Sequence, residues 1–226
     1  MLKDNRMRTI YDAVRGGVTV CDVGTDHGIL PIELILSGKS PKCVMTDISA
    51  PSLEKGISNA KNAGVYDRMA AYCTNGTLGV PFDTETDIII AGMGGELIAQ
   101  ILDQDERLKA PDHRFVLQPM SKPETLREYL AEKGFEVLSE QKTEAVGRVY
   151  SVITCRYTGE PYTLSEKERF LGYGFDAGLE LDRKYAEKVL AAFNVKLNGL
   201  RSAEMKDTVE IADLERGIEM ISELLK

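Results

Sequence analysis

Residues 20–34 read VCDVGTDHGILPIEL and carry the first strong structural signal of the chain. An apolar run ends at Gly24, a polar turn follows, and apolar residues then recur at helical spacing. A buried strand that passes through a glycine turn into a helix is how a βα unit of a parallel sheet begins. A dinucleotide-binding turn would read G-x-G-x-x-G, whereas Asp26 places a carboxylate inside this turn. That charge would repel a pyrophosphate, so the turn is predicted to bind a ligand without one.

Strand-like and helical segments alternate along the first 134 residues. Helices are expected at 28–38, 51–64, 96–104 and 121–134, among strand-like runs at 18–23, 42–49, 69–76, 86–95 and 114–119. The last helix is expected to start at a capping box formed by Ser121 and Glu124. Residues 135–157 break this rhythm, because two extended stretches there are too close together for a helical crossover. The pattern predicts an α/β fold with a doubly wound, Rossmann-like sheet, mostly parallel and ending in an antiparallel hairpin.

The character of the chain changes near residue 159. A second capping box, Ser165 with Glu168, starts a helical region, and Asn198-Gly199 offers a turn within it. Apolar residues recur there at coiled-coil-like intervals: Leu181, Tyr185, Val189, Phe193, Leu197 and Leu200, then Ile211, Leu214, Ile218, Ile221 and Leu225. Two domains are predicted, a sheet domain at 1–158 and a small helical, coiled-coil-like domain at 159–226. The alternative is that these helices simply cover the sheet.

The composition is that of an ordinary globular protein, with a net charge of −8 over 226 residues. This acidic balance argues against indiscriminate nucleic-acid binding but allows a local basic patch. The sequence holds no apolar run of about 18 residues and no signal-like N-terminus, so we expect a cytoplasmic protein without a membrane segment. Four scattered cysteines without CxxC spacing and only two histidines predict that there is no metal site.

Ligands of open α/β sheets bind at the carboxyl ends of the strands. This rule brings the turn around Asp26 next to Asp47 and the glycine-rich run 92–95. S-adenosylmethionine suits such a crevice, because it carries a sulfonium and an ammonium but no phosphate. Asp47 is expected to accept hydrogen bonds from its ribose hydroxyls. The alternatives are that Asp26 caps a helix and that Asp47 only forms a turn.

Three motifs now carry a family resemblance: DVGTDHGILPI at 22–32, AGMGG at 91–95 and LQP at 117–119. In this order they resemble the bacterial tRNA (adenine-22-N1)-methyltransferases, which are class I S-adenosylmethionine-dependent methyltransferases. The resemblance runs from about residue 5 to 157, and the helical tail is similar to the coiled-coil domain of that family. It implies methyl transfer from S-adenosylmethionine to N1 of adenine 22 in tRNA. The sequence departs from the family pattern at Gly28-Ile29 (usually Ala-Tyr), at Asn75 (usually Asp) and at Met120 (usually Asn).

The motifs and the resemblance together give a set of candidate site residues. Asp26 is the predicted catalytic residue, because its carboxylate can accept a hydrogen bond from the target amine and stabilise the cationic methylated base. The predicted cofactor-binding residues are Asp22, Gly24, Asp26, His27, Gly28, Asp47, Ile48, Asn75, Gly76, Ala91, Gly92 and Met93, and the predicted substrate-binding residues are Arg6, Gly94, Gly95, Gln118 and Pro119.

Residues 91–95 occupy the slot where amino-group methyltransferases usually carry [DN]-P-P-[FY]. An adenine ring nitrogen has an in-plane lone pair and needs no prior deprotonation, so the loss of that clamp is compatible with attack by a ring nitrogen. The alternative is that these glycines serve only close packing between strand and helix. Arg6, Arg8 and Lys3 are candidates for phosphate contact, or else they form the solvated face of a first helix.

Three functions remain open on the sequence. The leading one is tRNA adenine-N1 methylation by a monomer or weak dimer that binds tRNA. The second is methylation of another RNA base, a small molecule or a protein. The third is a binding module that has lost its chemistry, which the intact Asp26 and Asp47 oppose.

Overall fold

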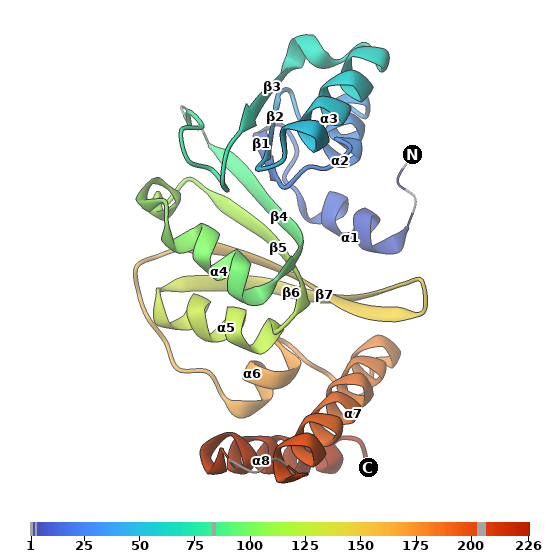
Figure 1. Cartoon of the computed structure of the whole chain (residues 1–226), viewed down its shortest axis with the longest axis vertical. Helices are drawn as coiled ribbons and strands as arrows, with labels where there is room; N and C mark the ends of the chain where they lie inside the picture. The colour runs from blue at the N-terminus through green and yellow to red at the C-terminus, as the bar shows by residue number, and fades with distance from the viewer. Residues whose placement is uncertain (1, 3, 83–84, 203–206) are drawn as a thin grey trace.

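The computed structural model describes residues 2, 4–82, 85–202 and 207–226, and its centre is a seven-stranded sheet. The strand order is β3-β2-β1-β4-β5-β7-β6 (Figure 1). The strands are β1 (Thr19–Val23), β2 (Cys43–Asp47), β3 (Met69–Cys73), β4 (Thr86–Gly94), β5 (Arg114–Ser121), β6 (Phe135–Ala145) and β7 (Arg148–Tyr157). The first five pair in parallel, and β7 runs antiparallel to both β5 and β6. The prediction of a mostly parallel sheet with a terminal hairpin is confirmed.

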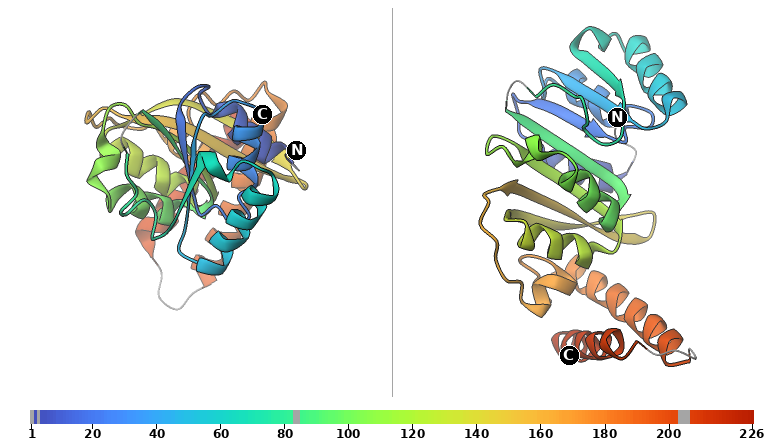
Figure 2. Two further views of the ribbon diagram at one scale, coloured as in Figure 1. Left: turned by 90° about the horizontal axis from the view of Figure 1, so that it is seen from above. Right: turned by 60° about the vertical axis from the view of Figure 1, so that its left-hand side comes forward.

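Five helices cover the two faces of this sheet (Figure 2). The helices α1 (Asn5–Ala13), α2 (Ile29–Leu36) and α3 (Ala50–Asn62) pack on one face, and α4 (Gly95–Asp103) and α5 (Pro123–Glu132) on the other. The central strand β4 shows why both faces are apolar. Ile88 and Ile90 contact the layer of α4 and α5, while Ile89 between them contacts the layer of α1 to α3. Successive side chains of a strand point to opposite faces, so a continuous apolar run is needed at the centre of such a sheet.

The start of α5 differs from the prediction. Ser121 is the last residue of β5, and the helix begins at Pro123 with Lys122 as its N-cap in the left-handed conformation (φ 50°). The predicted capping box of Ser121 and Glu124 is therefore wrong. Proline at the first helical position fixes the helix start, because its φ angle is already helical and its missing N–H is not needed there.

The C-terminal helices α6 (Glu166–Leu171), α7 (Glu180–Ser202) and α8 (Thr208–Leu224) lie beyond α5, and α7 contacts both strands of the terminal hairpin (Figures 1 and 2). The capping box of Ser165 and Glu168 is present at the start of α6. The turn predicted at Asn198-Gly199 is wrong, because α7 continues to Ser202. Burial of Leu197 against neighbouring side chains outweighs the weak helix propensity of the next two residues.

These helices form a small apolar core of their own. It contains Phe170, Leu171, Phe175, Tyr185, Ala186 and Ile221, and it includes Val149 from β7. A Cβ atom on Gly217 of α8 would lie 2.8 Å from the ring of Phe193 in α7, so α8 folds back closely against α7. These helices therefore pack against one another and also against the terminal hairpin. The division of the chain between residues 158 and 159 stays a prediction.

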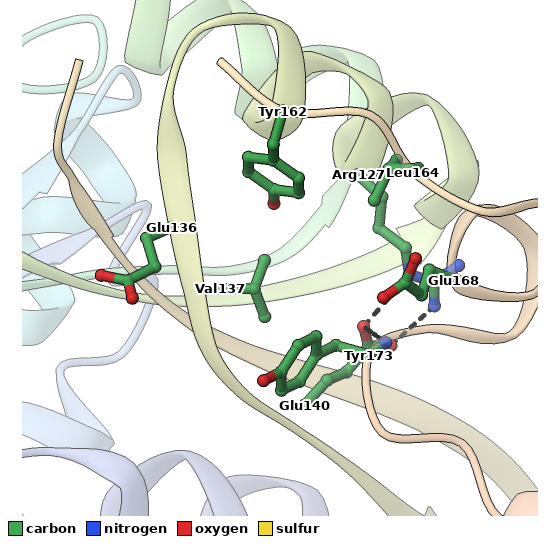
Figure 3. Close-up of a pocket in the computed structure, with 8 residues that line it drawn as sticks. All are labelled: Arg127, Glu136, Val137, Glu140, Tyr162, Leu164, Glu168 and Tyr173. Carbon is green, nitrogen blue, oxygen red and sulfur yellow. Dashed lines mark hydrogen bonds and ion pairs between the residues drawn. The ribbon is translucent and has the colours of Figure 1, made fainter. Parts of the chain in front are cut away.

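A buried ionic cluster joins this unit to the sheet, beside a cavity of about 230 Å³ (Figure 3). The carboxylate of Glu140 in β6 accepts hydrogen bonds from Arg127 of α5 at 2.6 Å, from Lys142 at 2.6 Å and from the backbone N–H of Tyr173 at 3.0 Å. Arg127 also donates to the hydroxyl of Tyr185 in α7 at 3.1 Å. Burial alone would raise the pKa of Glu140, but the charges of Arg127 and Lys142 lower it to about 2. Charge as well as apolar contact thus fixes the C-terminal helices to the sheet.

Candidate functional site

A cavity of about 360 Å³ lies at the carboxyl ends of β1 and β4. Its wall comes from α1, the end of β1 and the turn after it, α2 and the end of β4, and consists of Arg6, Met7, Ile10, Asp22, Gly24, Thr25, Asp26, His27, Ile29, Leu30, Ala91 and Gly92. The strand order reverses between β1 and β4, and ligands of open α/β sheets bind at that point. The predicted turn, the end of the fourth strand and the predicted Arg6 therefore meet in one cavity.

The turn between β1 and α2 is left-handed at Gly24, Asp26 and Gly28, with φ angles of 72°, 49° and 67°. A Cβ atom on Gly24 would lie 2.3 Å from Cε of Met93, so glycine lets the turn approach β4 closely. Helix α2 begins at Ile29, and its N-cap is Gly28, without a side-chain hydrogen bond. The alternative that Asp26 caps this helix is therefore wrong, and its carboxylate is available for another role.

Asp26 presents its carboxylate at the wall of the cavity with the side chain 66% exposed. One carboxylate oxygen lies 3.4 Å from Nε2 of His27. The backbone N–H of Asp26 donates to Oδ2 of Asp47 at 3.3 Å, which ties the turn to the end of β2. An exposed acid at a fixed position can accept hydrogen bonds from an amine or stabilise a nearby cation.

Asp22 is a buried carboxylate that faces the same cavity. Burial raises its pKa to about 6, against a hydrogen bond from Thr25 Oγ1 at 2.6 Å that lowers it, and the charge of Asp47 raises it further. Thr25 is its one hydrogen-bond partner among the residues that the structure describes. A cation bound in the cavity would compensate the cost of keeping this acid ionised. The site therefore favours a positively charged ligand.

The end of β2 and the loop after β3 lie next to the cavity and outside its wall. Asp47 accepts a second backbone hydrogen bond, from Ser49 at 2.8 Å, so it also forms the turn that the sequence left open as an alternative. Ile48 follows it with 74% of its surface exposed, which offers an apolar face to a flat ring. The side chain of Asn75 donates to Gln104 at 3.3 Å, and the Gln104 amide donates back to the Asn75 carbonyl at 3.2 Å.

A hydrogen bond to its backbone fixes the position of Gly76, the neighbour of Asn75. Its carbonyl accepts a hydrogen bond from the buried hydroxyl of Thr46 at 2.8 Å, which places the loop after β3 beside β2. A Cβ atom on Gly76 would lie 2.5 Å from Nε2 of Gln104. The predicted pair Asn75-Gly76 is thus fixed by contacts to β2 and to the end of α4.

Gln118 connects α1, β4 and β5 beneath the cavity. Its Oε1 accepts a hydrogen bond from Nη1 of Arg6 at 2.8 Å and one from the backbone N–H of Gly92 at 3.2 Å. Its Nε2 donates to the carbonyl of Pro119 at 2.9 Å. The two predicted substrate-binding side chains, Arg6 and Gln118, are therefore in direct contact although 112 residues separate them.

The glycines at the end of β4 and the start of α4 divide between site and packing. Gly92 lines the cavity, whereas a Cβ atom on Gly95 would lie 2.2 Å from the backbone oxygen of Lys122. A Cβ atom on Gly94 would lie 3.2 Å from Oγ of Ser121. The packing alternative thus describes Gly95, since only glycine allows α4 to approach the start of α5 this closely.

Tyr150 of β7 and Lys188 of α7 lie beside the site, and no sequence pattern identified either of them. The ring centroid of Tyr150 in β7 lies 5.9 Å from the guanidinium carbon of Arg6 and 5.6 Å from Nζ of Lys188 in α7. Alternation of a polar residue with apolar ones along an edge hairpin predicts that its side chain faces solvent. Only the fold therefore shows that Tyr150 contacts Arg6 and Lys188. Arg8, by contrast, pairs with Asp12 at 3.3 Å and lines no part of the cavity, and Lys3 lies outside the described residues.

Two further sequence expectations concern membranes and metals. Within the described ranges, the structure contains no helix that is both long and apolar enough to cross a bilayer. In the same part of the chain, no group of three histidine, cysteine, aspartate or glutamate side chains is placed to hold a metal ion.

Comparison with known proteins places this site in a family. A family model described as a methyltransferase domain matches residues 3–153. The tRNA (adenine(22)-N(1))-methyltransferase of Bacillus subtilis is 22% identical over 222 residues, which cover 91% of this chain and 93% of that protein. A putative tRNA methyltransferase of Mycoplasma pneumoniae is 30% identical over 188 residues, with 78% and 83% covered.

A solved structure from Streptococcus pneumoniae, described as a putative tRNA (m1A22) methyltransferase, is 25% identical with a TM-score of 0.86. The match covers 100% of both chains, including the C-terminal helices. The same protein has been solved in complex with S-adenosyl-L-methionine. The chain therefore belongs to the class I methyltransferase family and is a relative of the tRNA (adenine-22-N1)-methyltransferases.

Proposed function

We propose that this protein transfers a methyl group from S-adenosylmethionine to N1 of adenine 22 in tRNA. The observation that carries the proposal is the cavity at the strand reversal, where buried Asp22 and exposed Asp26 supply negative charge. Such a cavity suits a cationic cofactor without phosphate and disfavours a dinucleotide. The relatives from Bacillus subtilis and Streptococcus pneumoniae name adenine 22 of tRNA as their target.

The residues present fit S-adenosylmethionine. Asp22 faces the cavity as a buried acid with a raised pKa, and it would be stabilised by the ammonium group. Asp47 would accept hydrogen bonds from the ribose hydroxyls of the cofactor, and exposed Ile48 would cover one face of the cofactor's adenine. The other proposed cofactor contacts are Gly24, Asp26, His27, Gly28, Asn75, Gly76, Ala91, Gly92 and Met93.

The cofactor, when bound, supplies an electrophilic methyl group, and the chain has to bring a nucleophilic nitrogen in line with it. We assign the positioning of the target base to Arg6 and Gln118, which are held together at 2.8 Å, with Gly94 and Pro119 as further proposed contacts. Asp26 accepts a hydrogen bond from the exocyclic amine and stabilises the positive charge that develops on the ring. A base inside a helix would have to leave its stack to reach the cavity.

The finer biological context is also part of the proposal. The protein acts in the cytoplasm as a monomer or weak dimer, with residues 1–158 as the methyltransferase domain and 159–226 as a helical domain that helps to engage tRNA. No metal takes part in the reaction.

The test is to incubate the protein with methyl-labelled S-adenosylmethionine and an unmodified tRNA transcript, followed by nucleoside analysis. A transcript in which adenine 22 is replaced by guanine is the matched control. The proposal requires labelled 1-methyladenosine from the first transcript and none from the second. Label in another nucleoside, or at another adenine, would point to a different RNA target, and a lack of transfer to either transcript would exclude these RNAs as substrates.

A further inference from the structure

Another cavity, of about 670 Å³, lies between the β6–β7 hairpin and α7. We call it the second cavity, and we call the cavity beside Asp26 the first cavity. Figure 1 shows the hairpin tip extending between α1 and α7, and both helices contact the hairpin. The wall includes Met120 from β5, Arg148 and Tyr150 from β7, and Lys184 and Lys188 from α7. It is formed by the sheet and the C-terminal helices together.

The second cavity adjoins the first one through two contacts. Arg6 lines the first cavity and Tyr150 the second, and the guanidinium carbon lies 5.9 Å from the ring centroid. Gln118, which binds Arg6, also places its Nε2 3.6 Å from Sδ of Met120 in the wall of the second cavity. A polymer whose target unit enters the first cavity can therefore continue directly into the second.

The charge of the second cavity differs from that of the whole chain. Three basic side chains, Arg148, Lys184 and Lys188, face it together with the acids Glu144 and Glu187, whereas the chain carries a net charge of −8. Lys184 pairs with Glu144 at 3.0 Å. Arg148 and Lys188 make no ion pair with a carboxylate in the part of the chain that the structure describes.

Arg148 also lies close enough to Lys188 to affect its charge state. Burial lowers the pKa of Lys188, and the positive charge of Arg148 lowers it further. Its ammonium group donates to the carbonyl of Val149 at 2.7 Å and lies 5.6 Å from the ring centroid of Tyr150, so its position is fixed. Neither of these neighbouring cations is paired with a carboxylate, so a bound anion would stabilise both of them.

We propose that this second cavity binds the RNA backbone next to the target adenine, with Arg148 and Lys188 as phosphate ligands and Tyr150 as the aromatic wall against which a flanking base packs. The proposal rests on the proposed function, since it takes RNA as the substrate. It assigns to the hairpin, and to its junction with α7, the task of holding the strand while the target base occupies the first cavity. Phosphate contacts position a nucleic acid, and aromatic contacts add affinity without requiring a particular base.

The charge experiment measures tRNA affinity of the full-length protein against salt concentration. Arg148→Met and Lys188→Met should each weaken binding and flatten the slope of log K against log salt by roughly 0.7, the value for one phosphate contact on a single strand. Lys167→Met is the matched control, because Lys167 is exposed on α6 and lines neither cavity. Slopes equal to that of the control would overturn the proposal.

The aromatic experiment compares Tyr150→Phe with Tyr150→Leu under steady-state conditions. Loss of the ring should raise KM for tRNA by roughly 5- to 100-fold, while the phenylalanine variant stays close to the wild type. Calorimetric binding of S-adenosylmethionine shows whether each variant is folded, and it should not change. A leucine variant with normal KM would refute the role of the ring. If the wild type methylates no RNA at all, the proposed function fails. If the wild type is active but the charge variants and the leucine variant bind and methylate tRNA as it does, only the role of the second cavity in RNA binding is rejected.

Discussion

Arg6 donates a hydrogen bond from Nη1 to Oε1 of Gln118 at 2.8 Å, across 112 residues of sequence. The same oxygen accepts from the backbone N–H of Gly92 at 3.2 Å. One amide therefore holds α1 and the end of β4 in fixed positions at the cavity where the methyl group would be transferred. This network makes α1, which precedes the sheet, part of the site.

Replacement of Arg6 by methionine should leave Gln118 without its charged partner and loosen the end of β4 at Gly92. We expect kcat to fall by a factor on the order of 10², the cost of a displacement of about 1 Å in a catalytic geometry. The affinity for S-adenosylmethionine should change little. Arg6→Lys keeps the charge but loses the planar fork, so its kcat should lie between those of the methionine variant and the wild type. A normal kcat for Arg6→Met would show that the contact has no role in catalysis.

Asp22 should make cofactor binding depend on pH. Its pKa is raised to about 6 in the folded protein, so the proton is held more tightly than in the unfolded chain. The stability contributed by this shift is fully present below the unfolded value and is lost as the pH rises through about 6. A cationic ligand prefers the ionised acid, and its affinity should therefore fall as the pH drops through that range.

Calorimetry at pH 7 and pH 5 tests this linkage. The wild type should lose about tenfold in affinity for S-adenosylmethionine between the two values. Asp22→Asn should bind more weakly at pH 7 and show a much flatter profile, because the amide that replaces the carboxyl does not titrate. Parallel profiles for the two proteins would mean that Asp22 does not face the ligand's positive charge.

Glu140 should stabilise the junction with the C-terminal helices. Its pKa is lowered to about 2, so the stabilisation is present above the unfolded value of 4.5 and is lost as the pH falls towards 2. Glu140→Gln leaves the buried charges of Arg127 and Lys142 without a counter-ion, and it should reduce the free energy of unfolding by about 3–5 kcal/mol at pH 7.

Urea denaturation gives the comparison. Glu136→Gln on the same strand is the control, since its pair with Arg156 is exposed and should contribute only about 0–1 kcal/mol. The difference between Glu140→Gln and the wild type should shrink below about pH 4.5, where the unfolded carboxyl binds a proton. Equal losses for the two variants would contradict a stabilising role for the buried cluster.

Local patterns predicted the sheet well. The apolar run at Ile88–Ile90 and the glycine turn at residues 24–28 are structures that a few neighbouring residues determine, and both were predicted from the sequence. The helix boundaries at Ser121 and Asn198 were wrong, because Pro123 and the burial of Leu197 decided them instead. Residues with turn-like or cap-like propensity follow that propensity only where packing allows it.

The site was predictable only where it lies on strand ends. Asp22 and Asp47 lie at the ends of β1 and β2, and Asp26 follows β1, so the topology rule placed them together. Tyr150 and Lys188 could not be found, because their positions depend on how the hairpin packs between α1 and α7. Such contacts between distant elements leave no spacing pattern in a single sequence.

The carboxylate of Asp26 is the centre of this account, and Asp26→Asn tests it most directly. Asparagine tolerates the left-handed backbone at this position and keeps the shape of the side chain, while the charge is lost. The decisive measurement is the single-turnover rate of tRNA methylation at saturating S-adenosylmethionine, with cofactor affinity measured in parallel. We predict a rate lower by roughly 10²–10³ and nearly unchanged cofactor affinity. A normal rate would contradict a catalytic role for Asp26, and loss of cofactor binding in a folded protein would show that the acid holds the ammonium group of the cofactor instead.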